Sequence, residues 1–506
     1  MKEEVEQLES EWEELHRSTS ALGLDVILEL RGFYIKAGQM GAANIGNAFP
    51  PIWQDTFSVL QDGVPAKEFS VIRNILNEEF RGMGYKGGMD DVFESIEEDA
   101  IGAASIGQVH RAVLKNGNHE EVVVKIMYPE VERLFRGDVR TLKMFCQVAQ
   151  PVHVPSLEEV EVQFMTEFDY VKEAMQLENV RNNLIKAGLA QHDNNNNNNN
   201  NQNVLCVVPK PYLQYCGKRV LVMEQLHGDK IADALRNNMA HHASSLGKTP
   251  DQLLAEQKLK LEQARSEGKE MMGPSADEYD NYIALLDAKR RATNATKRIH
   301  NLTLGWWFPG CHKKEYEGID TLPINHAKII DDLIYVHGHE VLKDGYFNGD
   351  PHPGNILLIQ SKNKRPRLGL IDYGQVKKLS DKDRIFMCKM FIALDDDNHA
   401  EIVRLMKDAG FRSKYMNPEI MVKYCRLYFD QDNLALTGGK HIQVFIEELE
   451  AADPVVNIPR DLIMVHRTTF LLRGLAHALH QSRSIAKCWR PIAETVLKEE
   501  GITYPS

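Results

Sequence analysis

The segment FNGDPHPGN, residues 347–355, constrains the fold of this chain more than any other stretch. Its two glycines and two prolines exclude a helix or a central strand, so we expect a rigid loop. Asp350 and Asn355 lie five positions apart within it. Rigid loops hold polar groups in fixed directions on a packed scaffold, so an acid and an amide placed in this way indicate chemistry.

The spacing of Asp350 and Asn355 matches a kinase-type catalytic loop, in which the Asp takes a hydroxyl proton and the Asn holds one Mg²⁺ ion. Such a site needs a second acid at the end of a short hairpin. NILLIQSKNKRPRLGLIDYG predicts that hairpin, and its end places Asp372 before Tyr373 and Gly374 in a resemblance to D-F-G. Carboxylate and amide oxygens suit Mg²⁺, so Asn355 and Asp372 are the candidate metal ligands.

An ATP site also needs a cation beside the phosphates. EVVVKI places Lys125 on a predicted strand, like the Lys of V-A-I-K. This Lys needs an anionic partner, for which Glu173 is the first candidate and Glu167 the second. The resulting catalytic set is Lys125, Glu173 and Asp350.

The segment DAIGAASIGQVHRAV lies directly before the Lys strand, where a phosphate-covering loop would be, but it contains neither G-x-G-x-x-G nor a Walker A pattern. Its backbone N–H groups can still contact phosphates, although a loop with Ala in place of Gly is stiffer. The candidates for nucleotide contacts, besides Lys125, are Ala103, Ala104, Ser105 and Glu224.

The order of predicted elements indicates an α+β, protein-kinase-like bilobal fold with a β-rich N-lobe and a helical C-lobe. At least three antiparallel strands are expected after residue 95, and 157–184 reads as one long amphipathic helix. The predicted domains are a helical extension at 1–95, an N-lobe at 96–237, a charged insertion at 238–324 and a helical C-lobe at 325–506. The Asn run at 194–201 predicts a surface loop inside the N-lobe.

Composition excludes several alternatives. A formal net charge of −12 and a pI near 5.9 do not suggest a nucleic-acid partner. The seven Cys form no C-x-x-C pair, which argues against a disulfide framework or a zinc site. No apolar run is long enough to predict a spanning helix, and the acidic opening segment resembles neither a secretory signal nor a transit peptide.

Taken together, the motifs resemble the UbiB family of atypical protein-kinase-like proteins, the aarF-domain-containing kinases (ADCK). YIKAGQ at 34–39 is similar to the family's K-x-G-Q, and AASIGQVHRA at 103–112 is similar to its Ala-rich loop. EFDYVKEA at 167–174 contains its E-x-D, and GDPHPGN and IDYGQ complete the pattern. The resemblance runs from about residue 22 to about residue 479, with both insertions interrupting it.

The resemblance implies a regulatory lid. In the family, the K-x-G-Q helix is understood to fold over the place where an ordinary kinase receives its protein substrate. By carry-over, Lys36 and Gln39 would project into the pocket. Lys36 would pair with Glu167 and Asp169, which leaves Glu173 for Lys125.

The resemblance also implies ATP and Mg²⁺ as cofactors, a link to isoprenoid quinone or other lipid metabolism, and a mitochondrial or other organellar location with possible membrane association. The chain departs from the pattern at Asn348-Gly349, where many relatives have His-Ala or His-Thr. Ordinary kinases have Lys where His352 lies here, and His is a weaker clamp for the γ-phosphate. Two alternatives to a phosphotransferase or ATPase therefore stay open: a nucleotide-gated lipid-binding or scaffold protein, and a protein kinase acting in trans.

Overall fold

A computed structural model describes residues 2–32, 34–35, 38, 51–57, 59–62, 65–103, 106–149, 158, 161, 164–191, 204–245, 247–266, 273–307, 313–318, 322–361, 364–440, 442–479 and 481–504. The chain forms two compact units, each assembled from three separate stretches. Unit 1 comprises residues 1–184, 208–226 and 371–376, and unit 2 comprises 185–207, 227–370 and 377–506. The boundaries of the four predicted domains stay predictions.

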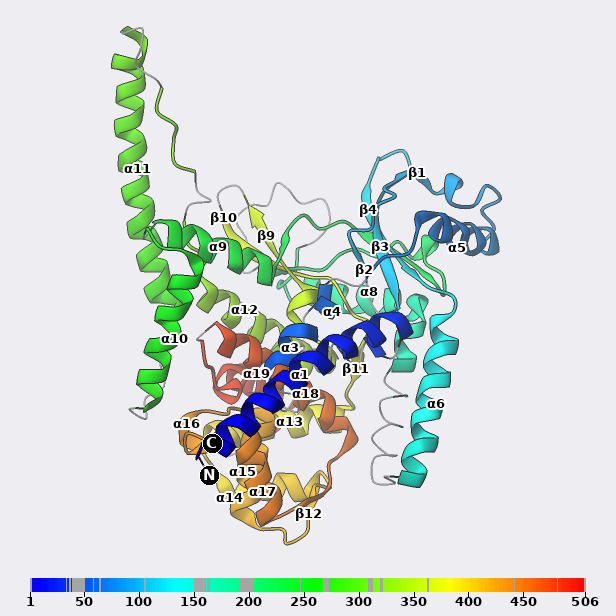
Figure 1. Ribbon diagram of the computed structural model, residues 1–506, viewed down its shortest axis with the longest axis vertical. Helices are drawn as coiled ribbons and strands as arrows, with labels where there is room; N and C mark the ends of the chain where they lie inside the picture. The colour runs from blue at the N-terminus through cyan, green and yellow to red at the C-terminus, as the bar shows by residue number, and fades with distance from the viewer. Residues whose placement is uncertain are drawn as a thin grey trace. The chain divides into compact units, whose positions relative to one another are not determined.

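Unit 1 contains an antiparallel sheet, drawn mainly in blue and cyan in Figure 1. The strand order is β1-β3-β4-β6, with β2 paired to β3. The strands are β1 (Phe93–Ile96), β2 (Gly102–Ala103), β3 (Gly107–Leu114), β4 (Glu121–Met127) and β6 (Val220–Glu224). The sequence KNGN at 115–118 lies between β3 and β4, and Gly117 takes a positive φ of 82° there, which favours glycine.

The helices of unit 1 lie before and after the first four strands of this sheet. They are α1 (Lys2–Leu30), α3 (Pro51–Phe57), α4 (Val59–Asp62), α5 (Phe69–Gly82), α6 (Val131–Ala149) and α8 (Tyr170–Lys186). α5 shows why such segments fold: Ile72, Ile75, Leu76 and Phe80 recur at helical spacing and all four are buried. α8 continues past the end of unit 1 at Leu184.

The single helix predicted for 157–184 is wrong, because the chain is extended at Asp169, with φ −142° and ψ 93°. Thr166–Phe168 forms a 3₁₀ turn before it, and α8 begins after it. Asp169 Oδ1 accepts the backbone N–H of Lys172 at 3.1 Å, so the carboxylate caps the new helix. The cap outweighs the continuous apolar periodicity that suggested one helix, and it places Glu173 in the first turn of α8.

Unit 2 contains a second sheet in the order β5-β10-β9-β7. Its strands are β5 (Cys206–Val207), β7 (Asp229–Lys230), β9 (Ile356–Ser361) and β10 (Lys364–Leu370). β9 and β10 form the predicted antiparallel hairpin, in which Ile356 pairs with Leu370. Asn355 directly precedes β9, and Asp372 follows the end of β10 by two residues. Shorter strands are β8 (Tyr346–Asn348), β11 (Val376–Lys378), β12 (Arg412–Ser413) and β13 (Val455–Asn457).

Most residues of unit 2 are helical. The helices are α9 (Ile231–Ser245), α10 (Pro250–Ser266), α11 (Ala276–Trp307), α12 (His326–Gly338), α13 (Asp381–Asp395), α14 (His399–Asp408), α15 (Pro418–Phe429), α16 (Leu434–Thr437), α17 (Ile442–Ala452), α18 (Arg460–Ala478) and α19 (Ile485–Glu499). α19 packs against α12 and α13 through the fully buried Trp489, whose indole N–H donates to Ile334 O at 2.8 Å. Helices together with largely antiparallel sheets confirm the predicted α+β class.

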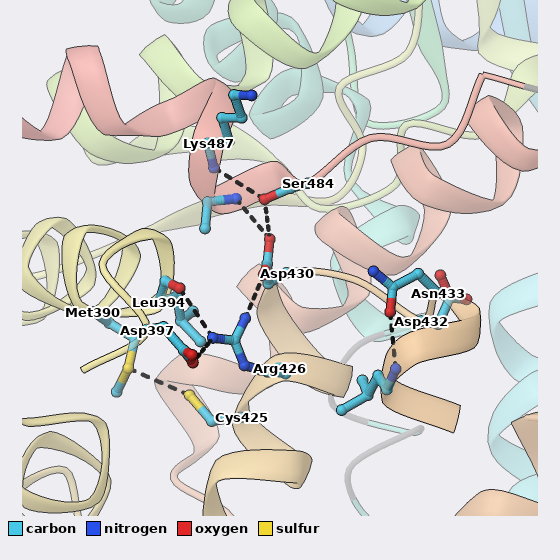
Figure 2. A network of polar contacts seen from close by, with 12 residues as sticks. Met390, Leu394, Asp397, Cys425, Arg426, Asp430, Asp432, Asn433, Ser484 and Lys487 are labelled. Atoms are coloured by element: carbon cyan, nitrogen blue, oxygen red, sulfur yellow. Dashed lines mark hydrogen bonds and ion pairs between the residues drawn. The ribbon is translucent and has the colours of Figure 1, made fainter. Parts of the chain in front are cut away.

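The ends of α13 and α15 meet the start of α19 at a buried polar network, shown in Figure 2. Asp430 lies at its centre and is 1% exposed. Ser484, the N-cap of α19, donates its hydroxyl to this carboxylate at 2.6 Å, and Arg426 donates to it at 3.2 Å. Such contacts fix the helices of the C-terminal half against one another.

A helix that crosses a bilayer needs about 20 consecutive, predominantly apolar residues. Among the described residues, no helix is both long enough and apolar enough to do so.

Candidate functional site

Lys125 lies on β4, the strand flanked by β3 and β6, where it pairs with Val109 on one side and Leu221 on the other. Its Nζ is 2.7 Å from Glu173 Oε1 and 3.2 Å from Asp372 Oδ2. All three residues belong to unit 1, although they come from a strand, a helix and the segment after β10. Of the two candidate partners for Lys125, it is Glu173 that the structure brings to the ammonium.

The three charged groups of this cluster differ in burial. The Glu173 side chain is 4% exposed, whereas that of Asp372 is 34% exposed. Burial raises the pKa of Glu173 to about 7, against the opposing effect of the Lys125 ammonium. Burial alone would lower the pKa of Lys125, but the carboxylates of Asp372 and Glu173 hold that pKa well above its ordinary value. The cluster therefore contains one firmly charged cation between two acids.

Tyr170 also contributes to this cluster, and the sequence analysis did not single it out. The Lys125 Nζ lies 5.1 Å from the centroid of the Tyr170 ring, within the range of a cation–π contact. The Tyr170 hydroxyl is buried and has no hydrogen-bond partner among the described residues. Burial raises the pKa of this phenol, so it stays neutral. The sequence signal that could have indicated Tyr170 was its position directly after Asp169, the residue that caps α8.

The predicted lid acids lie in the same unit. Glu167 Oε1 accepts a hydrogen bond from the Gln375 side chain at 2.6 Å, which ties the E-x-D segment to the segment that contains Asp372. Asp169 caps α8. Lys36 and Gln39 lie outside the described residues, so their predicted pairing with these acids stays a prediction.

The Ala-rich segment forms a hairpin between β2 and β3. Ala103 pairs with Gln108, while Ala104 and Ser105 lie outside the described residues. A Cβ at Gly107 would lie 2.1 Å from Ile126 O, so only glycine allows β3 to approach β4 this closely. This glycine keeps the hairpin against the strand that contains Lys125.

Glu224, the remaining candidate for nucleotide binding, ends β6 opposite Val122. Its Oε2 accepts the backbone N–H of Lys210 at 3.2 Å. Glu224 is therefore the last residue of β6, the strand at one edge of the sheet. Its predicted contact with the nucleotide stays a prediction.

The loop that contains Asp350 and Asn355 lies in unit 2 and is braced by its own backbone. The N–H of His352 donates to Asp350 O at 2.7 Å, and the N–H of Asn355 donates to His352 O at 2.8 Å. His352 Nδ1 accepts the N–H of Gly354 at 3.1 Å. These short-range contacts explain the rigid loop that the sequence predicts.

Groups outside this loop anchor it to the helical part of unit 2, two of them more than a hundred residues away in the sequence. Arg467 on α18 lies 3.1 Å from Asp350 Oδ1, and its neighbour Thr468 donates its hydroxyl to Asn348 O at 3.3 Å. The buried Glu340 accepts the N–H of Asn348 at 3.1 Å. Sequence reasoning missed all three anchors. The signal for Arg467 was a cation on a largely apolar helix without an acid within four residues.

Asp372 has the chemistry of a Mg²⁺ ligand, because it offers hard oxygens and is partly exposed. Its Oδ1 accepts the N–H of Gly374 at 2.9 Å, which fixes the direction of the carboxylate. Among the described residues, no three His, Cys, Asp or Glu side chains gather into a metal centre made by protein alone. Mg²⁺ commonly takes one or two carboxylates and completes its shell with phosphates and water, so the residues present fit that ion together with a nucleotide.

Comparison with protein families gives a match to the ABC1 atypical kinase-like domain over residues 59–263 and 295–406. The matched residues include Lys125, Glu173, Asp350, Asn355 and Asp372. The segment 264–294 lies between the two matched parts and has no counterpart in the family model.

Curated relatives are similar over nearly the whole chain. An AarF domain-containing protein kinase 1 from Xenopus laevis is 24% identical over 95% of this chain and 75% of its own length. A probable serine/threonine-protein kinase, abkD, from Dictyostelium discoideum is also 24% identical, but the chain spans only 53% of that protein. A probable protein kinase UbiB from Sodalis glossinidius is 21% identical over 93% of this chain and 69% of its own length.

A solved structure, the complex of Rv3197 and erythromycin from Mycobacterium tuberculosis, matches with a TM-score of 0.46 at 18% identity, over 96% of this chain and 97% of that one. The family model matches more than half of the chain, and the relatives are named as kinases of the AarF and UbiB groups. The chain therefore belongs to the ABC1 atypical kinase-like family.

Proposed function

We propose that this chain binds ATP with Mg²⁺ and acts as an atypical kinase-like phosphotransferase or ATPase. One observation carries the proposal: a largely buried Lys on an interior strand of a sheet is held between a buried acid and a partly exposed acid. Kinase-type phosphoryl transfer uses a Lys–Glu ion pair together with a metal-holding Asp, and its catalysis consists mainly of positioning and charge stabilisation.

In this proposal, Lys125 positions the α- and β-phosphates. Glu173 orients it, since Glu173 is withdrawn from water and accepts the shorter of the two contacts at 2.7 Å. Asp372 is the residue that a metal can reach, because a third of its side chain surface is open. The chemistry supplied by bound Mg²⁺ is the neutralisation of phosphate charge.

For Asp350 we propose the role of general base or nucleophile-orienting acid, and for Asn355 that of a second Mg²⁺ ligand. Their support is the spacing of five within the loop and the order Lys, Glu, Asp, Asn, Asp along a chain of this family. Arg467 supports the role of Asp350 as well, because its guanidinium holds the carboxylate in a fixed direction.

The remaining roles rest on the family. The backbone at Ala103, Ala104 and Ser105 would contact the phosphates, and Glu224 would contact the nucleotide. The lid role extends to Lys36, Gln39, Glu167 and Asp169. A link to quinone or other lipid metabolism, membrane association and a mitochondrial location also belong to the proposal, with support from the UbiB and AarF names of the relatives.

The direct test is thermal stabilisation by ATP, with and without Mg²⁺. A ligand at about 100 times its Kd stabilises the folded state by about 2.7 kcal/mol. Lys125→Ala and Asp372→Asn should each weaken ATP binding by about tenfold or more, and Asp372→Asn should also reduce the dependence on Mg²⁺. Lys86→Ala is the matched control, because Lys86 is exposed and distant in sequence from every site residue. Equal shifts in all four proteins would contradict the proposed site.

The alternative function is a nucleotide-gated lipid-binding or scaffold protein with little phosphotransfer, and His352 favours it. His352 occupies the position of the kinase Lys, and its Nδ1 accepts a hydrogen bond from the Gly354 N–H within the loop. His is also a weaker clamp for the γ-phosphate than Lys. Phosphate release from ATP, measured with and without quinone-like phenols, distinguishes the two. Asp350→Asn abolishes release if the protein is an enzyme. In a scaffold, release is already negligible and the variant binds lipid normally.

A further inference from the structure

α11 is the long green helix of Figure 1, and its first turn is anchored within unit 2. The side chain of Asn325, the N-cap of α12, donates to Ala276 O at 2.9 Å and to Asp280 Oδ1 at 2.7 Å. Beside it, the Tyr279 ring packs edge-on against His326, with ring centroids 4.7 Å apart. The start of the helix is therefore fixed, and the remainder of its 32 residues extends from this anchor.

A short segment of the chain, residues 313–318, covers one side of α11, and that side is polar. Asn294 and Glu317 exchange two hydrogen bonds, of 2.9 and 2.8 Å, between the amide side chain and the backbone. Asn301 and Lys314 exchange two more, of 2.9 and 2.8 Å. Lys297 adds an ion pair with Glu317 at 3.0 Å. The polar face of the helix is thus the face that the protein covers.

The opposite side of α11 carries an exposed apolar stripe, which we call the seam. Its spacing alternates between three and four residues, the a and d pattern of a coiled coil. The seam consists of Leu285, Ala288, Ala292, Ala295, Ile299 and Leu302, all of them exposed. The three large side chains, Leu285, Ile299 and Leu302, are 69%, 63% and 62% exposed. Leaving them in water forgoes about 25 cal/mol for each Å² that could be buried.

We propose that the seam binds an amphipathic helix of a partner protein, one whose own apolar stripe is flanked by acidic residues. The charges beside the seam select this partner. From Ala288 to Trp307 the sequence contains no Asp or Glu, and Lys289 and Arg298 occupy e and g positions next to the seam. Arg291, at another g position, already pairs with Asp287 at 2.7 Å. Acids at the facing positions of a partner helix would pair with these cations.

Self-association through the seam is disfavoured by the same charges. An antiparallel pair of α11 helices would bring Arg298 of one copy beside Arg291 of the other, whose acid Asp287 already pairs with two arginines, and a parallel pair would gain no opposite charges. A lipid surface fits less well than a helix. Membrane-bound helices need a wide apolar face, whereas this seam is narrow and its middle consists of Ala288, Ala292 and Ala295, which add little buried area but let a second helix approach closely.

The seam lies partly outside the shared family domain. Leu285, Ala288 and Ala292 fall within residues 264–294, which the family model does not match. Partner binding at this place would therefore distinguish this chain from relatives that have the domain without the insertion. It does not depend on the nucleotide site.

The test uses the full chain and two fluorescent helical peptides of about three heptads, with Leu and Ala at the a and d positions. One has Glu at its e and g positions and the other has Lys. Anisotropy should show that the Glu peptide binds about tenfold more tightly than the Lys peptide. Ala292→Glu should abolish binding, while Ala255→Glu, on an exposed position of the neighbouring α10, should leave it unchanged. The double variant Lys289→Glu, Arg298→Glu should reverse the preference between the peptides.

Four results would overturn the proposal. Equal affinity for both peptides, or binding that Ala292→Glu does not alter in a folded protein, would remove the seam as the binding face. A dimer in sedimentation that Ala292→Glu dissolves would assign the seam to a second copy. Flotation with vesicles of phosphatidylcholine and phosphatidylserine, lost in Ala292→Glu, would assign it to lipid. Unchanged thermal melting of both Ala→Glu variants establishes that they fold.

Discussion

Two buried charge clusters, one in each compact unit, satisfy their acids in different ways. In unit 1, Lys125 is shared between Glu173 and Asp372, and Asp372 stays partly open to water. In unit 2, Asp430 is enclosed and accepts hydrogen bonds from Ser484, Ala486 and Arg426 (Figure 2). The first cluster contains two acids around a single cation, and the second has a donor for each oxygen of its central acid.

The position of Asp430 explains its full satisfaction. Its Oδ1 accepts the hydroxyl of Ser484 at 2.6 Å and the N–H of Ala486 at 3.0 Å, at the start of α19, where the helix dipole favours a negative charge. Arg426 also donates to Leu394 O at 3.3 Å, so it ties α15 to α13. Arg473, next to this network, donates to Leu427 O at 2.7 Å and lies 4.0 Å from Asp432.

The difference separates a structural cluster from one suited to bind a ligand. A buried carboxylate whose oxygens all accept hydrogen bonds holds helices together, but it has no free oxygen with which to bind a ligand. A cluster with an excess acid and a partly exposed oxygen retains affinity for a further cation. Burial and strong interaction are common to both, so neither property by itself identifies a binding site.

The largest effect is expected for Asp430→Ala. Removing one partner of a buried, hydrogen-bonded ion pair costs about 3–5 kcal/mol, because the remaining cation and the N-terminus of α19 lose their acceptor. Urea unfolding should show this loss. Asp381→Ala, at a 95% exposed acid 3.5 Å from Arg384, should cost less than about 1 kcal/mol. Similar losses of unfolding free energy in the two variants would show that the enclosed cluster around Asp430 contributes no more stability than an exposed ion pair.

A smaller effect is expected from pH at the Lys125 cluster. Burial raises the pKa of Glu173 to about 7, above its ordinary 4.5, so the folded protein keeps this proton over a range in which the unfolded chain has lost it. The associated stability is fully present below pH 4.5 and is lost as the pH rises through 7. The slope is at most about 1.4 kcal/mol per pH unit.

Glu173→Gln should remove this slope, because Gln does not titrate. The measurement is the free energy of unfolding of wild type and variant at several values between pH 4.5 and 7. Glu98→Gln, at an exposed acid, is the control and should follow the wild type. A difference between wild type and Glu173→Gln that stays constant across this range would show that Glu173 titrates normally.

The smallest effect is expected for Tyr170→Phe. A buried hydroxyl without a hydrogen-bond partner is unfavourable by about 1–3 kcal/mol, so its removal should leave stability unchanged or raise it by about 1 kcal/mol. Tyr128→Phe is the matched control with the opposite sign, because the Tyr128 hydroxyl donates to Gln108 at 2.7 Å and its loss should cost about 1 kcal/mol. A larger loss in Tyr170→Phe than in Tyr128→Phe would point to a missing partner for Tyr170.

The features that could be predicted from sequence are those with local causes. Glycine and proline determine the loop around Asp350, and alternating apolar residues with a polar turn determine the β9–β10 hairpin. The contact between Lys125 and Glu173 could be predicted because the order of the kinase-type motifs along the chain implies which residues meet. Asp169 shows where prediction from local pattern fails. Apolar periodicity predicted one helix through this residue, but its side chain caps a new helix instead.

Contacts that depend on tertiary packing could not be predicted. Nothing near Arg467 in the sequence names Asp350 as its partner, and nothing near Glu340 shows that it would accept an N–H from Asn348. The insertion is similar: the polar face of α11 is covered by residues 313–318 and its apolar seam is exposed, although the sequence predicted no more than a charged insertion at 238–324. Which face of a helix is covered depends on the neighbours that the fold supplies.

The interleaving of the two compact units has a consequence for how this protein could have evolved. Each unit is assembled from three stretches that alternate along the gene. A single crossover could therefore not have exchanged one complete unit for that of another protein, since no point in the chain has all of unit 1 on one side and all of unit 2 on the other. The six residues that return to unit 1 after β10 include Asp372, so unit 1 receives this acid only after the chain has passed through residues 185–207 and 227–370 of unit 2.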